Sequence, residues 1–254
     1  MTLARYVKQS FERLTGLHLH RTLPRGVDFA YDVVRSLPRL RIETVFDVGA
    51  HMGQSVREFR RAFPVADIHC FEPVDATFKL LQSMLAHDSR SMCHRLAMAA
   101  EPGRREIAVG AESSMSGFRE HANGRDMSVG GIEMVEVDTL DRFCAMHGVL
   151  HINLLKIDTE GGDLDVLKGG EGLIGSQCVD LIQVEAGMSP SNTWHVPFDA
   201  FRDHLAARGY ALFALYHQVP EWPTGEPHLR RVDAMFVSGR VIADNRAIVA
   251  PAGK

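Results

Sequence analysis

The sequence has little of what marks a disulfide-stabilised, zinc-binding or membrane-spanning protein. Only four cysteines occur in 254 residues, and none of them forms a C-x-x-C pair, so we expect neither a zinc site nor a disulfide framework. No apolar run is long enough to cross a bilayer. The segment Met1–Leu14 is charged throughout and lacks the apolar core of a secretory signal. These absences favour a cytoplasmic protein without a transmembrane segment.

The sequence also lacks a strong charge of either sign and the short motifs of several hydrolase classes. Lys and Arg number 28 against 32 Asp and Glu, for a net charge of −4, which gives no electrostatic reason to expect a nucleic-acid partner. Although there are 13 histidines, no H-E-x-x-H occurs, and G-x-S-x-G is absent. Zinc-protease and α/β-hydrolase functions are therefore excluded.

What is present fits one α/β domain with a short N-terminal extension. The hydrophobic content of 45% in 254 residues suffices for a sheet covered on both faces. Residues 1–40 are predicted to be a helical N-terminal extension, because apolar residues recur there at three- and four-residue steps: Val7, Phe11, Leu14 and Leu17, then Phe29, Val33, Val34 and Leu37, before Pro38. We expect this segment to cover one edge of the sheet. The alternatives are a lid over a site and a contact in a homo-oligomer.

Residues 41–245 alternate between short apolar runs and helical stretches, which predicts β-α-β units and a mostly parallel twisted sheet. The expected strands are Thr44–Val48, Ile68–Phe71, Cys93–Met98, Leu154–Ile157, Val179–Val184, Ala211–Tyr216 and Ala234–Val237. The expected helices are Gln54–Phe63, Ala76–Ala86, Leu164–Leu173 and Phe198–Arg208. Residues 100–137 break this pattern and are predicted to be a loop-rich insertion with two short strands, Glu106–Gly110 and Met134–Val137. The tail after Asn245 is expected to be loose.

The first chemically informative stretch follows the first predicted strand. It reads D-V-G-A-H-M-G-Q-S from Asp47 to Ser55. Glycines allow a tight turn and close approach of the backbone to a ligand, and a helix start offers unpaired N–H groups to a polar ligand. The stretch predicts a nucleotide-like cofactor. It does not match G-x-G-x-x-G, because His51 stands where a glycine is required and no third glycine follows, so a dinucleotide is disfavoured.

Two further stretches place carboxylates at predicted strand ends. Glu72, followed by Pro73, lies 23 residues after Gly49, where a carboxylate can accept hydrogen bonds from both hydroxyls of a ribose. Four acids then follow the strand that ends at Ile157. We expect Asp163 to cap the next helix and Asp165 to face solvent, which leaves two acids to face the site: Asp158 and Glu160.

Together these stretches resemble the FkbM family of methyltransferases, which has D-V-G-A-N-x-G, then F-E-P, then K-I-D-x-E-G-x-E-x-x-V-L-x-G. The likeness extends from Asp47 to Glu185 and includes a V-x-x-L-D element at Val137–Asp141. It implies a Rossmann-like class I methyltransferase fold that binds S-adenosylmethionine and methylates a hydroxyl of a sugar, glycolipid or polyketide-type natural product. His51 departs from the family's Asn, and Asp163 departs from its Glu.

The resemblance also implies roles for individual residues. The cofactor's methionine part is expected against Asp47, Gly49, Ala50 and Gly53, with His51, Ser55 and Pro73 nearby, the ribose on Glu72, and Ser114 in the loop after the third strand. Asp158 is expected beside both cofactor and acceptor.

Removal of the acceptor's hydroxyl proton needs a base. The candidates at strand ends are Asp158, Glu160 and Glu185. These acids are numerous enough to hold Mg²⁺, but no diagnostic metal spacing is present, so a metal is not indicated. His217, His195 and Trp194 are weaker candidates to face the acceptor. The alternatives for the whole chain are an NAD-type Rossmann oxidoreductase and a catalytically inactive cofactor-binding interaction module.

Overall fold

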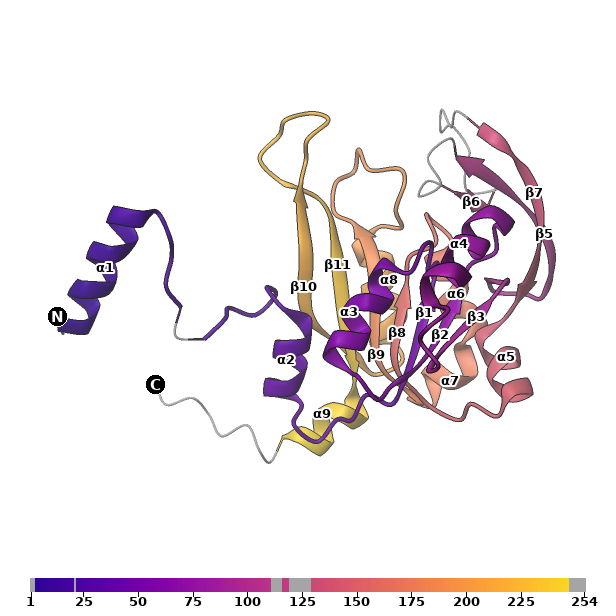
Figure 1. The fold of residues 1–254 in the computed structure, drawn as a ribbon, viewed down its shortest axis with the longest axis horizontal. Coiled ribbons are helices and arrows are strands. Elements are labelled where there is room, and N and C mark those ends of the chain that lie inside the picture. The colour runs from indigo at the N-terminus through magenta and orange to yellow at the C-terminus, as the bar shows by residue number, and fades with distance from the viewer. Residues whose placement is uncertain (1–2, 21, 111–115, 119–128, 247–254) are drawn as a thin grey trace.

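The structure is a computed structural model that describes residues 3–20, 22–110, 116–118 and 129–246. Within these residues a seven-stranded sheet forms the centre of the protein (Figure 1). In spatial order its strands are β10 (Tyr210–Pro220), β11 (Leu229–Ser238), β9 (Val179–Gly187), β8 (Ile152–Ile157), β1 (Thr44–Val48), β2 (Asp67–Phe71) and β3 (Ser91–His94). The strands from β9 to β3 run parallel, and β11 and β10 complete the sheet in antiparallel pairs. Chain order reverses between β1 and β8, which is where open α/β sheets bind ligands.

Both faces of this sheet are buried, because successive side chains of a strand point to opposite sides. In β1, Val45 packs in one apolar cluster and Phe46 in the other. One face is covered by α2 (Phe29–Ser36), α3 (Gln54–Ala62), α4 (Asp75–Leu85) and α9 (Gly239–Asn245). The other face is covered by α5 (Leu140–His147), α6 (Asp163–Gly169), α7 (Glu171–Gly175) and α8 (Phe198–Ala206). The predicted α/β fold with a mostly parallel sheet and helices on both faces is confirmed.

In the insertion at 100–137 the described residues are mostly strand, which corrects the expectation of a loop-rich segment, and the two strands expected at Glu106–Gly110 and Met134–Val137 are parts of longer ones. Its described residues form a second sheet in the order β4 (Ala97–Met98), β7 (Val129–Asp138), β5 (Gly103–Gly110) and β6 (Gly117–Phe118). The predicted strand Cys93–Met98 divides between the two sheets as β3 and β4. One face of the second sheet is solvated, so exposed and buried residues alternate along β7. Arg104 of β5, for example, forms an exposed ion pair with Glu136 of β7 at 2.8 Å.

Three further helical details differ from the prediction. The expected helix Leu164–Leu173 is broken into α6 and α7 at Gly170. The end of α6 packs closely against the backbone after β4, since a Cβ on Gly169 would overlap the carbonyl oxygen of Ala99. Helix α5, which we did not predict, begins at a Thr139 cap whose hydroxyl accepts from the Arg142 N–H at 3.1 Å. Helix α9 was not predicted either.

The two N-terminal helices behave differently from each other. Helix α2 packs on the sheet through Val33 and Leu37, and the buried carboxylate of Asp32 accepts from the Gly26 N–H at 2.8 Å and the Tyr216 hydroxyl at 3.1 Å. Helix α1 (Leu3–Thr15) stands apart from the body (Figure 1). The expectation that the N-terminal segment covers a sheet edge is therefore wrong for α1, although α2 packs beside the edge strand β10. In the part of the chain that is described, no helix has both the length and the hydrophobicity to span a bilayer.

Candidate functional site

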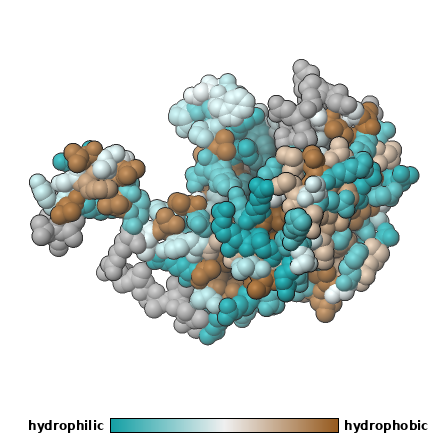
Figure 2. Space-filling model, viewed as in Figure 1, coloured by the Kyte–Doolittle hydropathy of each residue, from teal (hydrophilic) through white to brown (hydrophobic). Residues whose placement is uncertain are grey.

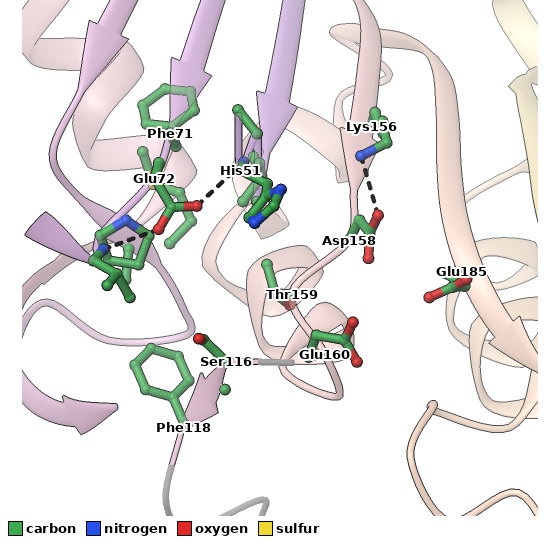
Figure 3. Close-up of a pocket in the computed structure, with 18 of the residues that line it drawn as sticks. His51, Phe71, Glu72, Ser116, Phe118, Lys156, Asp158, Thr159, Glu160 and Glu185 are labelled. Atoms are coloured by element: carbon green, nitrogen blue, oxygen red, sulfur yellow. Dashed lines mark hydrogen bonds and ion pairs between the residues drawn. The ribbon is translucent and has the colours of Figure 1, made fainter. Parts of the chain in front are cut away.

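A cavity of about 750 Å³ opens at the carboxyl edge of the central strands, a size within the usual range for small-molecule sites. Its walls come from the ends of β1, β2, β8 and β9, from the second sheet, from the loop 188–197 and from the β10–β11 hairpin. In Figure 3, Glu72 and His51 lie on one side, Glu185 lies on the other, and Asp158 and Glu160 lie between them. The pocket therefore extends across the point where strand order reverses.

The turn after β1 brings backbone close to backbone. Gly49 has a φ of +81°, and a Cβ at this position would overlap the carbonyl oxygen of Asp158. Its N–H and that of Ala50 both donate to the Phe71 carbonyl at 3.0 Å. Non-glycine residues strongly disfavour such a φ, and the space for a side chain is missing as well. Glycine is therefore required where β1, β2 and β8 converge on the pocket floor.

Glu72 follows β2 and is held by two backbone groups. Its Oε2 accepts from the His51 N–H at 3.2 Å and its Oε1 accepts from the Val74 N–H at 3.0 Å. Only 7% of the residue is exposed. Burial raises the pKa of Glu72 to about 7, against the lowering effect of these two hydrogen bonds. Each carboxylate oxygen keeps a second lone pair, so Glu72 can still accept from a ligand in the pocket.

A largely buried cation at the pocket wall connects β1 and β8. Lys156 Nζ lies 3.2 Å from Asp47 Oδ1 and 3.3 Å from Asp158 Oδ2. Burial by itself disfavours the ammonium, but the two carboxylates outweigh burial and raise the pKa of Lys156. The other oxygen of Asp47, Oδ2, and the hydroxyl of Thr159 are buried without a hydrogen-bond partner among the described residues. Buried polar atoms of this kind call for a ligand or a water.

Three carboxylates meet at the far side of this lysine. Oxygens of Asp158, Glu160 and Glu185 lie within 4.8 Å of one another. Glu160 takes a φ of +53° in the loop that follows β8, and its pKa is raised to about 7 by burial first and by neighbouring Asp158 second. The cluster is close enough to share a divalent cation. However, Lys156 and Arg231 already balance two of its charges, so the geometry does not require one.

The wall beyond these acids comes from a loop and a hairpin. Asn192 Oδ1 orders the loop by accepting from the N–H groups of Trp194 at 3.1 Å and His195 at 3.3 Å. His195 Nε2 then lies 2.8 Å from Glu185 Oε2, and Arg231 of β11 forms an ion pair with the same carboxylate. Burial lowers the pKa of His195 despite the acids around it.

The hairpin tip adds an exposed aromatic ring to this wall. Trp222 is 74% exposed, and the Arg230 guanidinium lies 5.7 Å from its ring centroid. Arg230 is itself held by Glu221, whose Oε1 accepts from it at 3.0 Å.

Most residues predicted from the sequence line this pocket, although their roles stay predictions. The lining includes Gly49, Ala50, His51, Ser55, Glu72, Pro73, Asp158, Glu160 and Glu185. Asp47 and Gly53 do not reach its surface. Asp47 lies fully buried below the pocket, while Gly53, with a φ of +82°, begins α3 against Leu81. Ser114 lies outside the described residues.

Three other expectations are corrected or refined. Asp163 does not cap α6. It is the first helical residue, and its buried carboxylate accepts from the N–H groups of Thr159 at 3.3 Å and Gly161 at 3.2 Å, which shapes the loop that presents Glu160. Asp165 faces outward only in part and forms an ion pair with Lys168 at 2.8 Å. His217 is not among the lining residues; it pairs with Asp233 at 2.7 Å on the hairpin. Trp194 and His195 do line the pocket.

Sequence reasoning missed several lining residues. Lys156 had a usable signal, because a lysine within a buried apolar strand needs a carboxylate partner. Arg230, Arg231 and Trp222 had none, since their position depends on the register of the hairpin. Phe118 reaches the pocket only because the insertion folds as a sheet.

Comparison with known proteins agrees with this arrangement. The methyltransferase FkbM domain model matches residues 47–212. Methyltransferase 1 of Beauveria bassiana is 27% identical over 160 residues, which are 56% of this chain and 63% of that protein. The 31-O-demethyl-FK506 methyltransferase FkbM of Streptomyces tacrolimicus is 28% identical over 155 residues, 51% of this chain and 60% of that protein. The 2-O-methyltransferase NoeI of Sinorhizobium fredii is 25% identical over 138 residues, 50% of this chain and 57% of that protein.

The match covers the functional edge of the sheet but not the whole of these proteins. The chain spans about three fifths of the length of the curated relatives it matches. The matched region begins at the end of β1 and contains the pocket residues of β2, β8 and β9. Because the domain model covers more than half of the chain and includes the motifs that build the pocket, this chain belongs to the FkbM methyltransferase family.

Proposed function

We propose that the protein transfers a methyl group from S-adenosylmethionine to a hydroxyl oxygen of a small-molecule acceptor. One observation supports this above the others: a single pocket joins a carboxylate placed to bind a nucleoside diol with a second set of carboxylates placed to accept a proton. Glu72 provides the first function, and Asp158, Glu160 and Glu185 provide the second.

The residues on one side of the pocket fit the cofactor. Glu72 has free lone pairs for the ribose hydroxyls, and apolar side chains beside it offer a surface for the adenine: Phe71, Val74, Leu96, Met98, Ile107 and Phe118. The backbone at Gly49 and Ala50 borders the space for the methionine part. The buried, unpartnered Oδ2 of Asp47 would receive the cofactor's ammonium directly or through one water. A pocket rich in carboxylates also suits a ligand with two positive charges.

When bound, S-adenosylmethionine supplies a methyl group that its sulfonium already makes electrophilic. The protein's tasks are then to orient the acceptor and to take up its hydroxyl proton. We assign the proton to Glu160. Asp158 is engaged in an ion pair with Lys156, and Glu185 is engaged by Arg231 and His195. Glu160 instead has a pKa near neutrality, which suits a base that must both accept and release a proton. Asp158 and Glu185 then serve to position the acceptor.

The acceptor side has features that suit a ring-shaped alcohol. Trp194 and Trp222 offer aromatic surfaces, and Arg230 and Glu185, which line the same pocket, offer a hydrogen-bond donor and an acceptor. Two relatives are named as a 31-O-demethyl-FK506 methyltransferase and a 2-O-methyltransferase, both of which name an oxygen as the methyl acceptor. We therefore propose a hydroxyl of a sugar, glycolipid or polyketide-type compound.

The test uses the purified chain with S-adenosylmethionine labelled in its methyl group. Methyl glycosides, extracted glycolipids and a macrolide alcohol are incubated separately, and mass spectrometry locates the label. We expect a labelled methyl ether in one class, and thermal stabilisation by S-adenosylhomocysteine but not by NAD. Stabilisation by NAD alone would support the oxidoreductase alternative. Label on nitrogen or carbon would contradict transfer to oxygen, and cofactor binding without transfer to any acceptor would favour the inactive module.

A further inference from the structure

Helix α1 presents an apolar face that nothing in the described chain covers. Tyr6, Val7 and Leu14 are 61%, 59% and 89% exposed. At about 100° per residue these side chains and that of Phe11 share one side of the helix. In Figure 2 hydrophobic residues stand out on this helix, away from the body. The side of the body nearest α1 is formed by α2, which exposes Val34 as well (Figure 1).

The rims of this apolar face are basic. At the same helical spacing Lys8 and Arg13 lie roughly 100–120° to either side of the centre of this face. Glu12, the one acid in residues 1–25, is engaged locally: its Oε1 accepts from the Leu19 N–H at 2.8 Å and lies 3.6 Å from Lys8 Nζ. Residues 1–25 contain five Lys and Arg and one Glu, a net charge of +4, in a chain whose net charge is −4. Positive charge is therefore concentrated in this N-terminal segment, with Lys8 and Arg13 beside the uncovered face.

We propose that α1 lies in the headgroup region of a bilayer that contains anionic phospholipids. An apolar face of Tyr, Val, Phe and Leu flanked by cations matches the requirements of a helix that lies flat at such a surface, with its apolar side in the acyl boundary and its cations among lipid phosphates. The stems of Lys8 and Arg13 can extend along the apolar boundary while their charges reach the headgroups. A docking groove on a second copy would instead need an acidic rim beside an apolar floor. This inference is independent of the proposed chemistry.

The test is co-sedimentation of the full chain with vesicles of phosphatidylcholine, with and without phosphatidylglycerol. We expect binding to the anionic vesicles that weakens as salt rises from about 0.1 M to about 0.5 M. The double variant Val7→Glu/Leu14→Glu should lose at least tenfold in vesicle affinity. Lys8→Glu/Arg13→Glu should lose affinity for anionic vesicles only. Leu150→Glu is the matched control, because Leu150 is 83% exposed on the body and far from α1 in sequence, and it should bind as the parent does.

Two outcomes would overturn the inference. One is equal binding of the parent and the Val7→Glu/Leu14→Glu variant. The other is no vesicle binding together with a dimer, seen by light scattering, that this variant dissociates; a second copy would then occupy the face. Melting temperatures distinguish a folding defect from lost binding. Because α1 stands apart from the core and Leu150 is exposed, we expect all three variants to melt with the parent.

Discussion

At the scale of single residues, burial sets the protonation of the pocket acids. Glu72 and Glu160 have pKa values of about 7, mainly because the protein replaces water around them. Asp158 lies beside Lys156, whose pKa is raised by the two carboxylates that it contacts. Acids of similar chemistry therefore stand in different environments, because burial dominates at Glu72 and Glu160 while a buried ammonium contacts Asp158.

Replacing Glu72 by Gln should weaken binding of S-adenosylhomocysteine by roughly tenfold or more, because a hydrogen bond to a charged group is worth about 1.5–3 kcal/mol. The affinity of the parent should rise from about pH 6 to about pH 8 as Glu72 loses its proton, and this rise should shrink in the variant. Calorimetric titration at both pH values measures this. Glu58→Gln, an exposed acid of α3 outside the pocket, is the control. An unchanged affinity in Glu72→Gln would show that Glu72 does not bind the nucleoside.

Replacing Glu160 by Gln should lower kcat by about 10²–10⁴-fold, the usual contribution of a general base. The parent's kcat should rise with pH through about 7, where Glu160 becomes a carboxylate, and the variant should lack this rise. Steady-state rates across the pH range test both points. Affinity for S-adenosylhomocysteine, measured in parallel, should change little. If affinity and rate fell together, Glu160 would be a binding group and the base would lie elsewhere.

At the scale of elements, the site depends on turns that follow parallel strands. The turn after β1 and the loop after β8 touch at Gly49 and Asp158. The Asp163 carboxylate holds the loop after β8 by accepting hydrogen bonds from two of its backbone N–H groups. The sheet therefore positions Glu72, Asp158 and Glu160 through backbone contacts, because each of these residues lies within a few residues of a strand end.

Gly49→Ala should destabilise the protein and abolish cofactor binding together. The left-handed φ costs an alanine about 1–2 kcal/mol, and overlap with the Asp158 carbonyl would force β1 and β8 apart. We expect the melting temperature to fall by roughly 5 °C or more, given about 2–4 °C per kcal/mol for a chain of this size. S-adenosylhomocysteine should no longer raise it.

The matched control for Gly49→Ala is Gly175→Ala. Gly175 ends α7, has open space where a Cβ would stand and has no positive φ. Alanine there should leave the melting temperature unchanged or slightly higher. Equal effects at the two glycines, measured by thermal melting, would mean that the close approach of β1 and β8 is not the reason why glycine is needed at position 49.

At the scale of the whole molecule, buried titratable groups pull the pH dependence of stability in opposite directions. Glu72, Glu160 and Asp163 have raised pKa values of about 7, 7 and 6. Their native state binds more protons than the unfolded chain, so the stability they confer is present at low pH and lost as pH rises through these values. Burial lowers the pKa of His94 to about 4, so its contribution is lost instead as pH falls.

The double variant Glu72→Gln/Glu160→Gln isolates the acids from the histidines. Glutamine does not titrate, so the variant's stability relative to the parent should increase between about pH 5.5 and about pH 8, by roughly 1–3 kcal/mol. Urea unfolding at the two pH values measures this difference, and Gly175→Ala, which removes no titratable group, should show none. A relative stability that decreased with rising pH would mean that these carboxylates are charged in the native state throughout this range.

Local signals in the amino-acid sequence are enough to specify the order of strands and helices in the parallel part of the sheet and the three segments that meet at its edge. These signals are apolar periodicity, glycine turns and acids directly after buried strands. Each of them is contained within a few neighbouring residues. That is why Gly49, Glu72 and Asp158 could be assigned to one pocket from their sequence context alone.

The pairing of distant segments, by contrast, is a property of the folded chain. Asp47 and Lys156 lie 109 residues apart, and Arg231 reaches Glu185 only through the register of β11 on β9. The second sheet was missed for the same reason, since β5 and β7 are stabilised by pairing with each other. Strand pairing joins segments that are distant in sequence, and the residues of one strand do not by themselves indicate which strand it will pair with. Strand pairing brings Lys156 and Arg231 to the acids of the pocket. The choice of Glu160 as base depends on these contacts.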